Sequence, residues 1–156
     1  MLKIEITSDM RENAKEKAFE MGVLRNSIMK GERNEVGFLG EEVVLKYLRR
    51  KGCNTKDYDL LFKGKHYDVK TKLRKDDPKP DWDCSIAAYN TIQKCDGYIF
   101  VSLVKDQNYA WILGYMPKEE YFSSATYWPK DKYDPSNGYK VRASCYNLKI
   151  KDLKGI

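Results

Sequence analysis

The stretch that most limits the folds open to this chain is Asp59–Lys75, in which the apolar run Leu60–Phe62 precedes Lys63-Gly64 and polar and apolar residues alternate after it. Two such segments on either side of a glycine predict a β-hairpin, because glycine relieves the turn of a Cβ clash. On the second strand Asp68 and Lys70 share one face, since successive side chains of a strand point to opposite sides. Pairing of the two strands across the turn brings Asp59 near Asp68.

Two interpretations of this hairpin stand side by side. Two carboxylates next to an ammonium can bind a hard divalent cation and orient a water against a phosphate. The sequence Asp-Val-Lys-Thr-Lys at 68–72 is also typical of the solvated face of an antiparallel strand, and a motif this short recurs by chance. The choice between them depends on the rest of the chain.

The length and the net charge of the chain limit the number of domains and the kinds of partner that it can have. With 156 residues the chain is long enough for one domain with a hydrophobic core and too short for two ordinary domains, so residues 1–156 are expected to form a single domain. The net charge of +6 is unevenly spread, because residues 46–75 hold 11 Lys or Arg and 3 Asp. A local positive field suits a polyanion such as nucleic acid, although a basic surface without a partner shows the same excess. Its concentration around the hairpin favours nucleic acid.

The cysteines indicate the compartment. Cys53, Cys84, Cys95 and Cys145 are widely spaced, form no Cys-x-x-Cys pair, and have a single histidine to accompany them. They are therefore expected to be reduced, mostly buried thiols of a cytoplasmic protein rather than zinc ligands. The first residues alternate like a short strand and not like a signal peptide, and no apolar run is long enough to span a bilayer, so no membrane partner is expected.

Periodicity, capping residues and turn residues predict an alternating series of helices and strands around the hairpin. Before the hairpin we expect a strand at Leu2–Ile6, a helix at Asp9–Met21 with Ser8 as N-cap and Gly22 at its end, a loop or helical turn at Leu24–Lys30, a helix at Arg33–Lys51 ended by Gly52, and a linker at Gly52–Tyr58. After the hairpin we expect a loop at Asp76–Asp81, a strand or helix at Trp82–Tyr89, a turn or short helix at Asn90–Cys95, and strands at Gly97–Leu103 and Tyr109–Tyr115. The last part of the chain is expected to form a short helix from Pro117 at its N1 position to about Ala125, a loop at Thr126–Gly138, and strands at Tyr139–Arg142 and Tyr146–Ile150.

The helix at 33–51 contains two glycines, Gly37 and Gly40, one turn apart on one face. Each costs about 1 kcal/mol relative to alanine, which indicates close approach to another backbone. Glu41 lies on nearly the same face as Gly37 and is expected to point inward, where a carboxylate needs a partner or a cation. Glu42 is turned further outward and is expected to be solvated.

Four features follow one another along the chain: a Gly-x-x-Gly-Glu helix ending at Glu41, then Asp59, then Asp68-Val69-Lys70, then Gln93 before an apolar strand. In order and spacing they resemble the PD-(D/E)xK nuclease superfamily, also called restriction-endonuclease-like, and in particular the small nucleases carried by bacteriophages. The resemblance covers about residues 33–104 and leaves the N-terminal strand and helix (1–32) and the C-terminal extension (105–156) unexplained. It implies an α/β fold with an αβββαβ core, in which a mixed central β-sheet is flanked by helices.

The resemblance also implies a metal site. Asp59 and Asp68 would bind Mg²⁺, with Mn²⁺ able to substitute. Glu41 would be a further acidic ligand, direct or through water, and the carbonyl of Val69 would complete the coordination. The family's proline before the first aspartate is Tyr58 here, which the family often tolerates.

Catalytic roles follow from the same resemblance. Lys70 would orient or help activate the attacking water and neutralise charge on the scissile phosphate. Gln93 would be an accessory residue that contacts water, phosphate or Lys70. Asp57 competes with Asp59 as the first ligand, but it would lie on the opposite face of the strand, so Asp59 is preferred.

Four further cations of the hairpin are expected to contact the nucleic-acid backbone, which would position the substrate without specifying its sequence. They are Lys63, Lys65, Lys72 and Arg74.

Three functions are compatible with these residues. The first is a Mg²⁺-dependent deoxyribonuclease, expected to be an endonuclease, in the cytoplasm of a bacterium or a phage-infected host. The second is a catalytically inactive nucleic-acid-binding module on the same fold, and the third is a small basic structural protein. Cutting of both strands would favour a homodimer, but no interface is legible in the sequence.

Overall fold

The computed structural model describes residues 1–24, 32–53, 55–135 and 138–156. Its elements follow one another in the order β1 (Leu2–Glu5), α1 (Ser8–Leu24), α2 (Glu32–Leu48), β2 (Leu60–Phe62), β3 (Lys65–Arg74), β4 (Asp83–Ala87), the 3₁₀-helix η1 (Ala88–Ile92), β5 (Gly97–Val104), β6 (Tyr109–Pro117), α3 (Lys118–Ser124), β7 (Thr126–Trp128), β8 (Tyr133–Asp134), β9 (Tyr139–Lys140), β10 (Cys145–Lys149) and the 3₁₀-helix η2 (Ile150–Asp152). The fold class is mixed α/β, as predicted. Most of the loop or helical turn expected at 24–30 lies outside the described residues.

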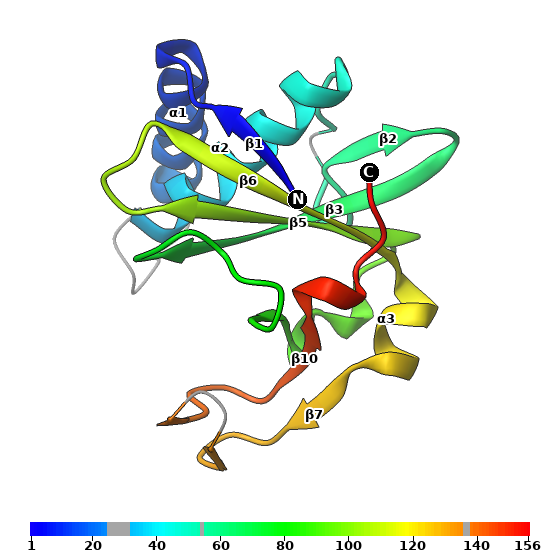
Figure 1. Ribbon diagram of the computed structural model, residues 1–156. Coiled ribbons are helices and arrows are strands. Elements are labelled where there is room, and N and C mark those ends of the chain that lie inside the picture. The colour runs from blue at the N-terminus through cyan, green and yellow to red at the C-terminus, as the bar shows by residue number, and fades with distance from the viewer. Residues whose placement is uncertain (25–31, 54, 136–137) are drawn as a thin grey trace.

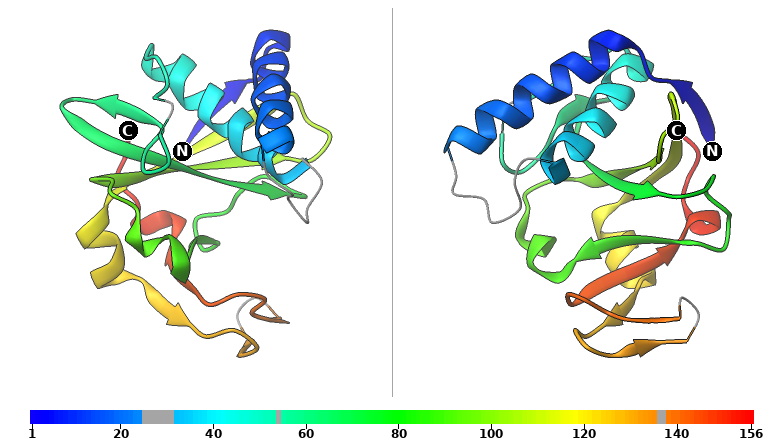
Figure 2. Two further views of the ribbon diagram at one scale, coloured as in Figure 1. Left: turned by 180° about the vertical axis from the view of Figure 1, so that it is seen from behind. Right: turned by 90° about the vertical axis from the view of Figure 1, so that its left-hand side faces the viewer.

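A curled five-stranded sheet with the strand order β1-β6-β5-β3-β2 forms the centre of the molecule. Within it β3 and β5 run parallel, whereas the other neighbouring strands are antiparallel. The helices α1 and α2 cover one face (Figure 1), and α3 with a small sheet of strands β4-β10-β7 covers the other (Figure 2). The middle of the central sheet is therefore covered on both faces.

The strand β5 has the apolar sequence that burial on both faces of the sheet requires. All eight of its residues are buried, as expected of an uninterrupted apolar run in a sheet that is covered on both faces. Ile99 and Val101 point into the core beneath the helices, whereas Tyr98 and Phe100 point into a second core against the small sheet. Because β5 pairs with β3, it fixes the strand that carries Asp68 and Lys70.

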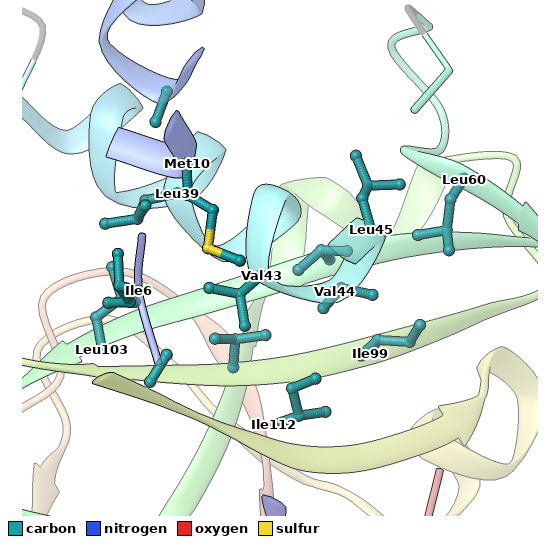
Figure 3. Close-up of a cluster of buried hydrophobic side chains, with 14 of the residues drawn as sticks. Ile6, Met10, Leu39, Val43, Val44, Leu45, Leu60, Ile99, Leu103 and Ile112 are labelled. Carbon is teal, nitrogen blue, oxygen red and sulfur yellow. The ribbon is translucent and has the colours of Figure 1, made fainter. Parts of the chain in front are cut away.

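The first core lies between α1, α2 and the central sheet, where Met10, Leu39 and Val43 pack against strand residues (Figure 3). The helix α2 comes closest to β3 at Gly40, where an added Cβ would lie 1.9 Å from Thr71 Oγ1. An added Cβ at Gly37 would meet no atom within 4 Å. Close approach was thus predicted correctly for one of the two glycines, and its partner is a side chain rather than a backbone.

The hairpin predicted at Asp59–Lys75 is present as β2 and β3. Leu60 pairs with Tyr67, and Lys63 and Gly64 form the turn with φ angles of 49° and 74°. Both angles are in the left-handed region, as a two-residue hairpin turn that matches the strand twist requires. The second strand is longer than a simple hairpin needs, because it continues along β5 as far as Arg74.

Several predicted helix ends are wrong. Thr7 rather than Ser8 caps α1, since Thr7 Oγ1 accepts a hydrogen bond from the Met10 N–H at 3.4 Å, and α1 continues through Gly22. The helix α2 ends at Leu48 and not at Gly52, because Arg49 adopts a φ of 52°, the left-handed conformation with which helices commonly stop.

Pro117 was expected at the N1 position of a helix, but it is the last residue of β6 and the N-cap of α3. The helix α3 therefore starts one residue later than predicted.

The third strand of the predicted αβββαβ core does not join the central sheet. The strand β4 forms within Trp82–Tyr89, but it pairs with β10, and the helix after it is a short 3₁₀-helix rather than an α-helix. Because β2 and β5 occupy both edges of β3, no edge of that strand is left for β4. The α/β class is therefore established, whereas this part of the expected core is wrong.

The predicted loop at Thr126–Gly138 contains two short strands, β7 and β8. The strand β7 pairs with β10, with Tyr127 opposite Tyr146, so its partner lies near the end of the chain. Across the described residues, the structure has no helix that combines the length and the apolar character needed to cross a membrane.

Candidate functional site

Asp59 lies at the entrance to the hairpin and is held against β3. Its backbone N–H donates to the carbonyl of Tyr67 at 2.8 Å, and its Oδ2 accepts the Val69 N–H at 2.6 Å. Asp57, the competing residue, instead accepts the Lys94 N–H at 3.2 Å. Asp59 is therefore the aspartate that lies beside the Asp68–Lys70 segment, as the sequence predicted.

Asp68, Lys70 and Gln93 form a hydrogen-bonded cluster, although Gln93 lies more than twenty residues further along the chain. Lys70 Nζ lies 2.7 Å from Asp68 Oδ2 and donates to Gln93 Oε1 at 2.9 Å. The amide nitrogen of Gln93 donates to Asp68 Oδ1 at 3.1 Å and is 3.5 Å from the carbonyl oxygen of Lys56. Gln93 thus bridges the carboxylate and the ammonium of β3.

The cluster is shielded from water. Asp68 is only 6% exposed, and the side chain of Lys70 is 17% exposed. Asp68 Oδ2 is an ion-pair partner of Lys70, but within the described residues it receives no well-directed hydrogen bond. One buried carboxylate oxygen therefore keeps a lone pair for a further positive partner.

Glu41, on α2, adds a third carboxylate to this region. Burial, together with the charges of Asp59 and Asp68, raises the pKa of Glu41 to about 8. Burial, followed by the charge of Asp68, raises the pKa of Asp59 to about 6, and burial also raises the pKa of Asp68. The three carboxylates are thus close enough to disfavour one another's ionisation.

The donor atoms of these residues are of the kind that binds a hard cation. Three carboxylates and the carbonyl of Val69 are oxygen donors, which Mg²⁺ and Mn²⁺ prefer. The raised pKa values of Glu41 and Asp59 indicate a shortage of positive charge beside these two carboxylates. However, among the residues that the structure describes, no three His, Cys, Asp or Glu side chains converge closely enough to hold one ion. Asp59 is turned to the Val69 N–H and Asp68 to Lys70 and Gln93, which keeps the carboxylates apart.

Two lysines that the sequence analysis did not single out act on this site. Lys17 of α1 lies 2.7 Å from Glu42 Oε1, and its charge lowers the pKa values of Glu41 and Asp59. Lys118, at the start of α3, donates from Nζ to the backbone carbonyl of Gln93. Both come from elements distant in sequence, so neither spacing nor periodicity points to them.

Glu42 was expected to be solvated, and that prediction is wrong. Its side chain is 14% exposed, pairs with Lys17 and accepts a hydrogen bond from Asn13 Nδ2 at 3.1 Å. The packing of α1 against α2 covers this face of the helix and supplies the partners that its carboxylate needs.

The four cations predicted to contact nucleic acid are in two different environments. Lys63 and Lys65 are exposed at the tip of the hairpin. Arg74 donates to Ser102 Oγ and to the Asp83 carbonyl, both at 2.8 Å, so two of its donors serve the protein itself. Lys72 is exposed along its side chain, yet desolvation of the ammonium, with Arg74 beside it, lowers its pKa.

All four cysteines are free thiols, as predicted; Cys84 and Cys95 are buried, whereas Cys53 and Cys145 are half-buried. Burial raises the pKa of Cys84 to about 12, which makes it a poor nucleophile.

Neither a scan against models of known protein families nor a search of curated proteins gives a match to this chain.

Proposed function

We propose that this protein is a Mg²⁺-dependent nuclease of the PD-(D/E)xK type that hydrolyses phosphodiester bonds in DNA, as an endonuclease. The observation that carries the proposal is the 2.6 Å hydrogen bond from the Val69 N–H to Asp59 Oδ2. This bond sets Asp59 beside the Asp68–Lys70–Gln93 cluster. Two acids, a lysine and a glutamine are thereby gathered beside the start of β2 and the middle of β3.

Asp59, Asp68 and the carbonyl of Val69 would hold the cation, with Glu41 as a further acidic ligand. When bound, Mg²⁺ lowers the pKa of a coordinated water and offsets negative charge on a phosphate. The need for such a charge agrees with the raised pKa values of Glu41 and Asp59.

Lys70 supplies a positive hydrogen-bond donor at the same place. Its ammonium lies 2.7 Å from Asp68 and 2.9 Å from Gln93, which limits its rotation and aims it. A donor oriented in advance stabilises the charge that develops on a phosphate oxygen more strongly than a mobile lysine does. Gln93, in turn, positions Lys70 and Asp68 relative to each other.

The experiment that tests this proposal is a cleavage assay with Mg²⁺ or Mn²⁺ and an EDTA control. Supercoiled plasmid, linear duplex and single-stranded DNA separate endonuclease from exonuclease activity. Wild type is expected to cut only with the metal, whereas Asp68→Ala and Lys70→Ala are expected to fold and to cut at least about 100-fold more slowly. Metal-independent cutting, or full activity in both variants, contradicts the proposal.

A second candidate, a nucleic-acid-binding module without activity, is favoured by one observation. Among the described residues the carboxylates do not converge on a point, and Asp68 is already neutralised by Lys70. In the same assay this candidate predicts salt-sensitive DNA binding with no cutting under any metal condition.

A further inference from the structure

A large groove runs along α1, α2 and the segment that follows α2, and it has no role in the proposed chemistry so far. Its volume is 1580 Å³, above the roughly 300–1,000 Å³ of pockets that enclose a small ligand. Glu41 and Asp59 are among its lining residues, so the groove leads to the candidate site. An extended polymer fits such a space better than a small molecule does.

One wall of the groove is cationic. Its five positive side chains come from the end of α2 and the segment after it, and they are Lys46, Arg49, Arg50, Lys51 and Lys56. All five are exposed, so they can meet a phosphate without first breaking a buried ion pair. None of the cations that the sequence analysis assigned to the substrate lines this groove.

The floor of the groove offers apolar surface next to these charges. Phe38 and Met21 are half-buried and line it, and Phe38 lies one turn before Glu41 on the same helix. Paired bases hide their flat faces in the stack, whereas unpaired bases expose them and stack on aromatic side chains. An apolar floor beside a cationic wall therefore suits an unpaired strand better than a duplex.

The opposite wall is α1, which the resemblance left unexplained. Lys17 and Asn13 line the groove and are bound to Glu42 of α2. These contacts fix α1 against α2 beside Glu41 and hold the two walls at a set separation. The N-terminal helix thus has a structural reason to be present at the site.

We propose that this groove binds an unpaired DNA strand and delivers it to Glu41 and Asp59. The phosphates lie on the cationic wall of five exposed side chains defined above, and a base stacks on Phe38. The inference rests on the proposed function for the class of substrate, but binding can be measured without cleavage. It adds a substrate form and a set of contact residues to that function.

The test is fluorescence anisotropy in EDTA with a labelled single-stranded oligonucleotide and the duplex of the same length. The variant Arg50→Gln/Lys51→Gln removes two charges from the groove, and Lys130→Gln/Lys132→Gln removes two exposed charges from the loop after β7, outside the groove. Each pair removes two positive charges, so the overall loss of charge is the same. Each pair also removes one cation that lies over an aromatic ring, Arg50 over Phe62 at 5.7 Å and Lys132 over Trp128 at 5.3 Å.

The groove pair is expected to lower the affinity for the single strand by about tenfold or more and to reduce the salt slope by about 1.4. The Lys130→Gln/Lys132→Gln pair is expected to change that affinity less than twofold. Phe38→Leu, which keeps an apolar side chain but cannot stack, is expected to weaken single-strand binding and not duplex binding.

Equal losses in the two pairs, or tighter binding of the duplex by wild type, overturns the groove proposal. If wild type cuts DNA normally and the groove pair binds like wild type, this inference fails while the proposed function stands. If the groove binds the single strand as expected but no metal supports cutting, the proposed nuclease activity fails instead.

Discussion

The two halves of the candidate site are stabilised in different ways. On the side of the small sheet, Asp68, Lys70 and Gln93 satisfy one another through contacts of 2.7 to 3.1 Å. On the side of the helices, Glu41 and Asp59 are crowded carboxylates with pKa values of about 8 and 6. The chain builds the first half from its own charges, whereas in the described part of the chain no lysine or arginine forms an ion pair with Glu41 or Asp59.

The difference shows what each half can contribute. A satisfied cluster is rigid and can aim a donor, but it adds no affinity for a cation by itself. Crowded carboxylates are costly without a cation and become favourable with one. Lys17 offsets part of this cost, although its ammonium is committed to Glu42.

The largest effect is expected from removing the aimed donor. Lys70→Ala should lower the rate of Mg²⁺-dependent cleavage by about 10²–10³-fold, the usual loss when an oriented donor to a developing charge is deleted. Lys72→Ala is the matched control, because it lies on the same face two residues further on. A similar loss in both variants would show that β3 contributes bulk charge rather than a positioned lysine.

The next effect concerns the bridge in the satisfied half. Gln93→Ala should reduce cleavage by about 10–100-fold, as is common for residues that orient metal ligands. Gln107→Ala, an exposed glutamine in the turn after β5, serves as the control and should leave the rate unchanged. The rates are measured at saturating substrate. A wild-type rate in Gln93→Ala would show that the bridge from Gln93 to Asp68 and Lys70 does not contribute to catalysis.

The contact between the two halves can be altered through α2. Gly40→Ala forces a Cβ onto Thr71 and should destabilise the protein by about 1–3 kcal/mol, the usual cost of overpacking. Gly37→Ala meets no atom within 4 Å and should stabilise the helix by about 0.5–1 kcal/mol. Denaturant titration of both variants checks the opposite signs; equal effects would contradict the packing described here.

The smallest effect is a dependence of stability on pH in metal-free buffer. Because the folded pKa of Glu41 is raised from 4.5 to about 8, the folded protein holds a proton that the unfolded chain has released in this window. Stability should therefore fall as the pH rises from about 5 to about 8. The melting temperature is expected to drop by at least about 2 °C, the shift that about 1 kcal/mol gives in a chain of this size.

Glu41→Gln is the variant that isolates this effect. It should flatten the pH profile and melt higher than wild type at pH 8, because it removes an uncompensated carboxylate. A wild-type profile that is flat, or that rises with pH, would show that Glu41 ionises freely.

Local patterns made part of the site predictable. Period-two alternation put Asp68 and Lys70 on one face, and the glycine turn brought Asp59 to β3, as found. Gln93 was selected by its order in a motif, and the structure does bring it to Lys70, while its catalytic role stays a prediction. The prediction of a helix end was wrong where a residue other than glycine, such as Arg49, adopts the left-handed conformation.

Contacts between distant parts of the chain were not predictable. The pairing of β4 with β10 joins Asp83 to Lys149, and no pattern in either segment specifies the other. Lys17 reaches Glu42 only because α1 packs on α2, and the groove exists only because of the same packing. Side-chain alternation specifies which face a residue occupies, but not which element covers that face.

The most direct test of the account is calorimetric titration of Mn²⁺ into wild type, Asp59→Asn, Asp68→Asn and the control Asp57→Asn. Wild type and Asp57→Asn are each expected to bind one Mn²⁺ per chain. Asp59→Asn and Asp68→Asn are expected to bind Mn²⁺ at least tenfold more weakly. Binding that is absent in wild type, or that Asp59→Asn and Asp68→Asn leave unchanged, would contradict the claim that a cation unites the two halves of the site.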